Sequence, residues 1–139
     1  MRYLIDTNIL LFYASDDFDS LTSDVLQILD DYENRIYVSS ESVKEAIHLF
    51  QNNRIKTKKW KSARDIFSFI ENDWGITIDY IQKEHLYTFA GLETVFGHND
   101  PADRLIIAQA ITEKMPLISS DHKFELYREY HLDFIYNKR

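Results

Sequence analysis

The segment DPADRLIIAQAITEKMPLISSD (residues 100–121) contains a helix pattern followed by a buried strand, with acidic residues at both ends. Asp100 has the side chain of a helix N-cap, Pro101 suits the first helical position, and Asp103 falls in the first turn. The apolar run that follows predicts a helix, and the letters PLIS at 116–119 predict a strand. A helix that leads directly into a buried strand is typical of a parallel sheet.

The same alternation continues along the whole chain. Short β-rich apolar runs predict strands at 3–5, 36–38, 76–78, 116–119 and 133–136. Longer patterns with helical spacing predict helices at 8–14, 20–32, 40–52, 59–72, 81–90 and 101–114. This pattern indicates a parallel sheet that is covered by helices on both faces. Because no repeat or linker interrupts it, we expect one domain over residues 1–139.

The composition excludes several classes of protein. The 139 residues are 45% hydrophobic and 28% charged, as in soluble globular proteins, and a net charge of −7 argues against a general, charge-driven binder of nucleic acid. The absence of cysteine excludes disulfide frameworks and zinc–thiolate sites. Three glycines leave no phosphate-binding loop. Since neither a signal peptide nor a membrane span is evident, we expect a cytoplasmic protein with no membrane partner.

Four acidic residues follow or flank predicted strands. Asp6 comes directly after the strand at 3–5, Asp121 follows the strand at 116–119, Glu45 lies about one turn into a helix, and Asp103 lies in a first helical turn. Ligands of parallel sheets bind beyond the carboxyl ends of the strands, so we expect these carboxylates to converge there. Like charges repel unless a cation neutralises them. A histidine-free set of oxygen ligands suits Mg²⁺ or Mn²⁺.

The two aspartates of the DPAD motif need separate explanations. Helix-end electrostatics alone would account for both Asp100 and Asp103. It would not account for Asp6 and Asp121, which stand at strand ends. We therefore interpret Asp100 as the N-cap and Asp103 as the carboxylate that faces the site.

Other acids are weaker candidates for the same site. Asp79 also ends a strand-like run, but an aspartate in that position is often only a turn former. Glu41 lies one turn before Glu45, which is a shift of about 6 Å along a helix axis; helix direction favours Glu45. His48 is interpreted as a partly buried helix residue.

Three segments together resemble the PIN-domain family, and in particular the small VapC-type toxins of bacterial toxin–antitoxin pairs. They are YLIDTNILL (3–11), SSESVKEAIHLF (39–50) and NDPADRLIIAQAI with PLISSDHKF (99–124). The resemblance covers essentially the whole chain. It implies a three-layer α/β/α sandwich around a central parallel sheet of strand order 3-2-1-4-5. It also implies a metal-dependent endoribonuclease, with RNA as the substrate.

The resemblance also assigns residues and partners. The four acids of the family fall on Asp6, Glu45, Asp103 and Asp121, while Asn8 and Ser120 match polar positions that support the site. We expect Asp6 and Asp103 to bind Mg²⁺ or Mn²⁺ directly and the other two acids to act through water or a second ion. The family further implies a homodimer and a cognate antitoxin that blocks the site. Ala102 departs from the bulkier residue of many relatives.

One short segment of the chain is strongly basic, in contrast to the negative net charge of the whole. The residues RIKTKKWK (54–61) hold five cations, of which Arg54, Lys56, Lys58 and Lys59 are candidates for RNA contact or for a solvated loop.

Two other functions are alternatives to a toxin ribonuclease. A PIN nuclease of RNA processing without an antitoxin is one alternative. A receiver-like Mg²⁺-binding signalling module with Asp79 as phosphoacceptor is another, but it leaves the acids of 100–121 unexplained.

Overall fold

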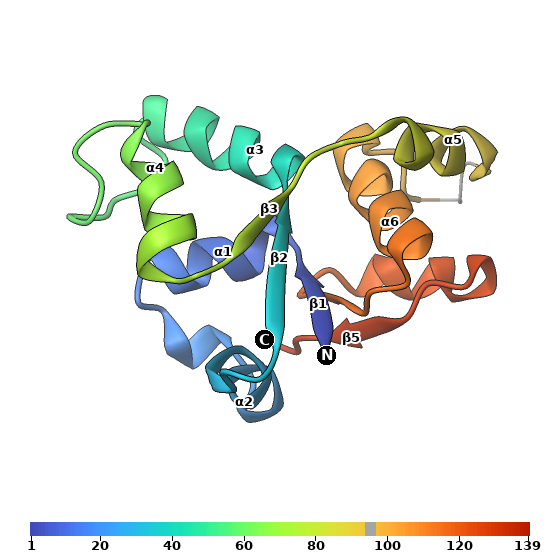
Figure 1. The fold of residues 1–139 in the computed structure, drawn as a ribbon, viewed down its shortest axis with the longest axis horizontal. Helices are drawn as coiled ribbons and strands as arrows, with labels where there is room; N and C mark the ends of the chain where they lie inside the picture. Colours follow the sequence, from blue (N-terminus) through green and yellow to red (C-terminus); the bar gives the residue numbers. More distant parts are fainter. Residues whose placement is uncertain (94–96) are drawn as a thin grey trace.

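A five-stranded parallel sheet forms the centre of the structure, a computed structural model that describes residues 1–93 and 97–139. Its strands are β1 (Arg2–Ile5), β2 (Arg35–Ser39), β3 (Thr77–Asp79), β4 (Leu117–Ser119) and β5 (Phe134–Tyr136). They pair in the order β3-β2-β1-β4-β5, and all four pairings are parallel. The predicted strand order and fold class are therefore confirmed (Figure 1).

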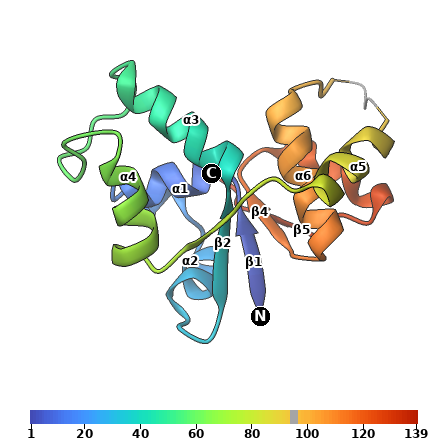
Figure 2. The same ribbon diagram turned by 45° about the horizontal axis from the view of Figure 1, so that its top comes forward.

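Helices cover both faces of the sheet. They are α1 (Thr7–Ala14), the 3-10 turn η1 (Phe18–Ser20), α2 (Ser23–Asp30), α3 (Ser40–Gln51), α4 (Asp65–Ser68), the π-helical turn η2 (Phe69–Asp73), α5 (Lys83–Gly91), α6 (Pro101–Glu113) and the 3-10 helix η3 (His122–Tyr130). In Figures 1 and 2, α1 to α4 lie on one side of the sheet and α5 and α6 on the other. None of the helices within the described residues is long and apolar enough to cross a membrane.

The central strand β1 supplies side chains to two separate cores. Leu4 packs with residues of α6 and η3, such as Ile107 and Phe124, while Ile5 packs with residues of α1 to α4, such as Ile9. Both β1 side chains are completely buried. Successive residues of a strand point to opposite faces, so the uninterrupted apolar run of β1 requires a layer of helices on each side.

Two predicted helices differ from the observed ones. The pattern at 20–32 is divided because Thr22 caps α2, with its hydroxyl accepting a hydrogen bond from the Val25 N–H at 3.2 Å. The prediction of helix from 59 onward is wrong, since regular helix begins only at Asp65. The Asp65 carboxylate accepts hydrogen bonds from the backbone N–H groups of Lys61 and Ser62 and so stabilises a turn there.

The buried side chain of Asn137 joins the end of β5 to two distant loops. Its oxygen accepts a hydrogen bond from the Thr22 N–H, and its nitrogen donates to the Ser20 carbonyl and the Ser120 hydroxyl, all within 2.8 Å. Its backbone N–H also donates to the Ser119 carbonyl. This one amide therefore fixes the loop after β4, which begins the site described below.

We expect Asn137→Ala to lower the free energy of unfolding by at least about 2 kcal/mol, because it leaves buried polar groups without partners. The neighbouring Lys138 is exposed, and Lys138→Ala should change stability by less than about 0.5 kcal/mol. Urea melts of the two variants provide the measurement. Equal stabilities would show that the Asn137 hydrogen bonds contribute little.

Candidate functional site

Asp6 lies in the protein interior at the point where β1 ends. It is the N-cap of α1, and its Oδ1 accepts a hydrogen bond from the Thr7 N–H at 2.8 Å. Its Oδ2 accepts one from the Ser119 hydroxyl at 2.7 Å, across the pairing of β1 with β4. Burial raises the pKa of Asp6 to about 7. The hydrogen bonds from Ser119 and Thr7 oppose this increase, and the charges of Asp103 and Glu45 add to it.

The two aspartates at the start of α6 have different roles. Asp100 is the N-cap, as predicted, and its Oδ1 accepts hydrogen bonds from the N–H groups of Ala102 and Asp103. The Asp103 carboxylate instead lies 3.4 Å from Nε2 of the buried His98. Partial burial and the charge of Asp100 raise the pKa of Asp103 to about 6; His98 opposes this increase and Asp121 adds to it.

Asp121 lies on the loop after β4 and caps η3 by accepting a hydrogen bond from the Lys123 N–H. Its own N–H donates to the Ser119 hydroxyl, so one serine contacts both the Asp6 side chain and the Asp121 backbone. Ligand atoms of His98, Asp103 and Asp121 all lie within 4.8 Å of one another. The structure therefore brings the ends of β1 and β4 and the start of α6 to one place.

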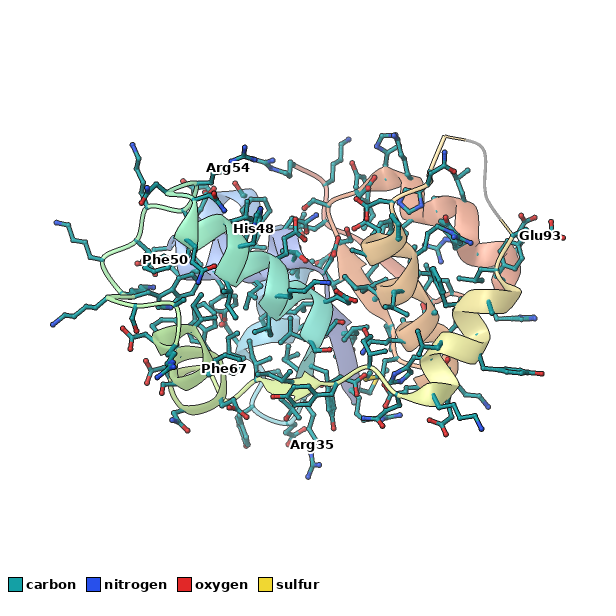
Figure 3. All side chains as sticks on the ribbon, turned by 90° about the horizontal axis from the view of Figure 1, so that it is seen from above. Arg35, His48, Phe50, Arg54, Phe67 and Glu93 are labelled. Carbon is teal, nitrogen blue, oxygen red and sulfur yellow. The ribbon has the colours of Figure 1, made fainter. Side chains whose placement is uncertain are left out.

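Glu45 extends the acidic group from α3. It lines a hollow of about 320 Å³ between α3 and α6, together with Glu41, Asp100 and Ala102. Glu41, one turn earlier, forms an ion pair with Lys44 at 2.6 Å, whereas Glu45 is exposed and acts electrostatically on Asp6. Figure 3 looks down on this edge of the molecule, with α3 and α6 on either side. The geometry therefore favours Glu45 over Glu41 as the acid that α3 supplies.

Within the described parts of the chain, no lysine or arginine forms an ion pair with Asp6, Glu45, Asp103 or Asp121. Their negative charge is therefore not neutralised by a basic side chain. Carboxylate oxygens from four separate elements are the donors that a hard divalent cation prefers. The residues present fit Mg²⁺ or Mn²⁺ on this ground.

The polar residues around Asp6 differ in part from those that the sequence suggested. Asn8 Nδ2 lies 3.4 Å from both Asp6 Oδ2 and Ser119 Oγ. Ser120 contacts Asn8 through its backbone N–H, and its hydroxyl accepts a hydrogen bond from Asn137. The hydroxyl that contacts Asp6 is that of Ser119, which the sequence analysis missed because two adjacent serines gave no sign of which one faces the site.

His98 is the second residue that the sequence analysis missed. It stands five positions before Asp103, outside any predicted element, and the metal site was expected to be free of histidine. The structure buries its ring and directs Nε2 toward the Asp103 carboxylate. Only the path of the loop before α6 reveals this contact, since sequence spacing gives no loop geometry.

The basic segment lies beyond the end of α3 that points away from α6 (Figures 2 and 3). Arg54, Lys56 and Lys58 are exposed. Lys59 instead forms an ion pair with Asp16 at 2.6 Å and lies over the ring of Phe69. Three of the four predicted RNA contacts are thus accessible, at a distance from the acidic group.

Asp79 belongs to a second acidic group at the end of the edge strand β3. Its pKa is raised to about 7, first by burial and then by its contact with Glu113. His85 Nδ1 accepts a hydrogen bond from the Gln82 N–H, so its proton lies on Nε2, which faces Glu113 at 3.1 Å. A protonated nitrogen has no lone pair for a metal ion. This group is therefore interpreted as a structural contact, in which the Asp79 carboxylate interacts with Glu113 and accepts a hydrogen bond from the side-chain amide of Gln109 at 3.3 Å.

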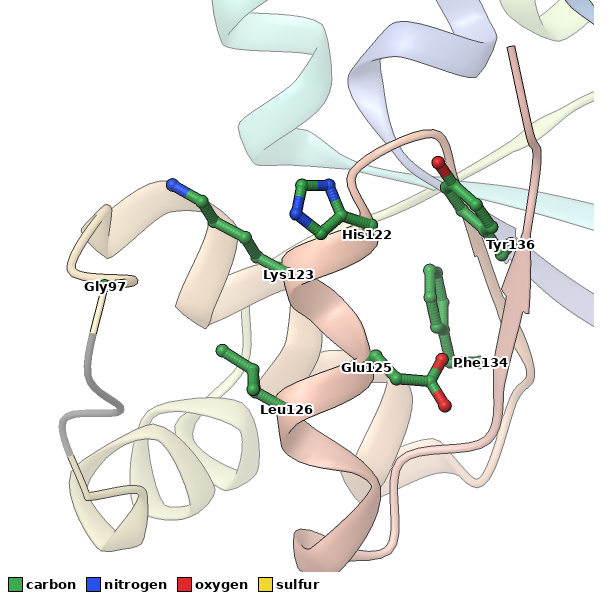
Figure 4. A pocket seen from close by; sticks show the side chains of 7 residues that line it. All are labelled: Gly97, His122, Lys123, Glu125, Leu126, Phe134 and Tyr136. Carbon is green, nitrogen blue, oxygen red and sulfur yellow. The ribbon is translucent and has the colours of Figure 1, made fainter.

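A mostly apolar groove of about 620 Å³ adjoins the acidic group along η3 and β5. Leu126, Phe134 and Tyr136 line it, and His122 and Lys123 extend from the first turn of η3 at its mouth (Figure 4). His122, one of the lining residues, directly follows Asp121, so part of the groove wall lies next to the acidic group in the chain.

The raised pKa of Asp6 leads to a prediction about stability and pH. In the unfolded chain the carboxyl loses its proton near pH 4, whereas in the folded, metal-free protein it does so near pH 7. The folded state binds more protons over that interval, so the contribution of Asp6 to stability falls as the pH rises from about 4 to about 7. Asp6→Asn removes this loss and should raise the melting temperature at pH 8, by an amount that shrinks toward pH 4.

Thermal melts of metal-free wild type and Asp6→Asn across this pH range make the measurement. Asp133→Asn, at an exposed position before β5 and away from the acidic group, serves as the control for the substitution itself. A lower melting temperature for Asp6→Asn at pH 8 would show that the hydrogen bonds of Asp6 outweigh its burial as a charge.

Comparison with known proteins agrees with this architecture. A solved structure of VapBC2 from Rickettsia felis, bound to a DNA fragment from their promoter, is similar with a TM-score of 0.69 and 19% identity, over 99% of this chain and 100% of that chain. VapBC-1 from nontypeable Haemophilus influenzae is similar with a TM-score of 0.64 and 18% identity, over 98% of each chain. FitAcB from Neisseria gonorrhoeae is similar with a TM-score of 0.61 and 17% identity, over 99% of this chain and 97% of that chain. No curated protein matches the chain. The family model of the PIN domain matches residues 3–130, and the chain therefore belongs to the PIN-domain family.

Proposed function

We propose that this protein is an endoribonuclease that hydrolyses RNA phosphodiester bonds with a bound Mg²⁺ or Mn²⁺. The observation that carries the proposal is the group of acids Asp6, Glu45, Asp103 and Asp121, which meets at the carboxyl edge of a PIN-family sheet without a basic side chain to neutralise it. Such a group destabilises the empty protein, which is understandable if a cation occupies it during function.

The residues of the site have distinct roles in this proposal. Asp6 and Asp103 bind the ion directly, and Asp121 and Glu45 bind it through water or hold a second ion. The bound ion would supply a water of lowered pKa and would stabilise the negative charge that develops on the phosphate and the leaving oxygen. The hydrogen bonds of Thr7 and Ser119 fix the Asp6 carboxylate, so its oxygens need little rearrangement to bind.

RNA would approach over the acidic edge of the sheet. Its phosphates would be attracted there only when the site holds a metal ion. The exposed cations Arg54, Lys56 and Lys58 would bind the backbone of the RNA beyond α3. Asp6 must lose its proton to bind the ion, since its pKa is near 7. Metal binding and RNA binding should therefore both strengthen as the pH rises through neutrality.

The biological setting that we propose is a toxin–antitoxin pair in the cytoplasm. Support comes from the similar structures, whose names describe VapBC proteins and, in one further case, a toxin–antitoxin complex from Klebsiella pneumoniae. A cognate antitoxin would then cover the acidic edge. A homodimer is part of this proposal, and the exposed side chains Tyr80, Leu86 and Tyr87 beside the edge strand β3 are suited to bury apolar surface in it.

The decisive comparison for the nuclease is between the two aspartates of α6. Asp103→Asn should lower the rate of RNA cleavage by about 100-fold or more, because it removes a negative charge that holds the ion, and the ion stabilises the transition state. Asp100→Asn keeps a good N-cap and should retain most of the activity. Mapping of cleaved ends in total RNA with Mn²⁺ gives the readout. An active Asp103→Asn with an inactive Asp100→Asn would reverse the assignment.

The basic segment should affect RNA binding and not the chemical step. With Mn²⁺ bound and a cleavage-resistant, phosphorothioate-linked single-stranded RNA, replacing Lys56 and Lys58 by Gln should flatten the salt dependence of binding, by about 1.4 in the log–log slope for two lost phosphate contacts. Lys114→Gln, at the opposite end of α6 from the site, is the control. An unchanged slope would mean that the segment does not contact RNA.

A further inference from the structure

A line of buried polar side chains lies behind the Asp103 carboxylate. Nδ1 of His98 lies 2.6 Å from the hydroxyl of Tyr127, and Nε2 of the same ring lies 3.4 Å from Asp103 Oδ2. His98 and Tyr127 are both buried. Edge-on contacts of the imidazole with the rings of Phe124 and Tyr127, at 5.6 and 5.3 Å between centroids, hold it in place. The ring therefore has little freedom to turn away from Asp103.

The Asp103 carboxylate indicates which nitrogen of His98 carries the proton. A carboxylate can only accept a hydrogen bond, and its Oδ2 faces Nε2 at 3.4 Å, so the proton of the neutral imidazole is assigned to Nε2. Nδ1 then has a free lone pair, and it accepts a hydrogen bond from the Tyr127 hydroxyl at 2.6 Å, which stabilises this tautomer.

This proton placement decides between two roles for His98. A nitrogen that carries a proton has no lone pair for a metal ion, so His98 is not expected to be a ligand. Its Nε2 is buried and, among the described residues, has no hydrogen-bond partner that meets ordinary geometry. At 3.4 Å a small rotation of the Asp103 carboxylate would bring Oδ2 into hydrogen-bonding distance and leave Oδ1 for the ion. Carboxylates that bind metals are commonly fixed by such donors.

We propose that His98 and Tyr127 are positioning residues that fix the Asp103 carboxylate for metal binding: Tyr127 sets the tautomer of His98, and the Nε2–H of His98 orients Asp103. The inference rests on the proposed function, since it assumes an ion at Asp103. It adds a polar chain from Tyr127 through His98 to the four-acid site. It also keeps the ligand set all-oxygen although a histidine lies beside it.

The test is a titration with Mn²⁺, in which electron paramagnetic resonance measures the free ion. Wild type should bind Mn²⁺, and Asp103→Asn should lose most of this binding. His98→Leu should weaken it about 10- to 100-fold, as loss of an outer hydrogen bond to a ligand typically does. His98→Gln should restore most of the affinity, because its side-chain amide can place an N–H near the position of Nε2. Tyr127→Phe should weaken binding by several-fold, because the imidazole is then free to adopt the other tautomer.

The outcomes separate the inference from the proposed function. A wild type that does not bind Mn²⁺ would overturn the metal site itself. Binding that is lost in Asp103→Asn but unchanged in Tyr127→Phe and in both His98 variants would overturn only the positioning role. Electron spin echo modulation from a directly bound ¹⁴N in the wild type, with no rescue in His98→Gln, would make His98 a ligand and would also overturn it. Should His98→Leu fail to fold, Tyr127→Phe and His98→Gln still decide the question.

Discussion

The burial of β1 on both faces of the sheet is the constraint on which the site depends. Leu4 and Ile5 belong to different cores, so a shift of one residue would exchange the two sets of contacts and is strongly disfavoured. This fixed register places Asp6 at the end of the strand, between β2 and β4. The same packing that stabilises the fold therefore buries a carboxylate, and the hydroxyl of Ser119 at the end of β4 is the nearest group to satisfy it.

The acidic side chains at the carboxyl edge of the sheet lower the stability of the metal-free protein. Burial and neighbouring negative charges raise the pKa values of Asp6 and Asp103, which means that their charged forms are disfavoured in the empty protein. Some other acids are neutralised by ion pairs, such as Glu41 with Lys44 and Asp16 with Lys59. The acids of the sheet edge have no lysine or arginine partner among the described residues, although they lie close enough to raise one another's pKa. An exchangeable cation can neutralise them without occupying the space that a substrate needs, whereas a basic side chain would fill it.

Local sequence patterns predicted the helices and strands that depend on interactions between residues close together in the chain. Apolar runs located the strands, and the DPAD motif gave the cap of α6 with Asp100 as the capping residue. The strand order followed only from the family resemblance, because periodicity contains no pairing information. The 3-10 helix η3 was not predicted, and neither were the contacts of Ser119 and His98. The two contacts depend on the approach of distant segments, such as β1 to β4, that no local pattern records. The residues assigned to metal and RNA remain predictions.

Two buried histidines illustrate why geometry, and not residue type, separates a structural group from a functional one. In His85, Nδ1 accepts a hydrogen bond from the Gln82 N–H, so Nε2 carries the proton toward a carboxylate. The tautomer that we propose for His98 has the same arrangement, with the Tyr127 hydroxyl as the donor to Nδ1. Glu113 receives the His85 proton at 3.1 Å and also contacts Asp79, which closes that group. Asp103 lies at 3.4 Å, half-buried beside Asp121. Because the Asp103 side chain remains partly exposed, a ligand can still reach its carboxylate.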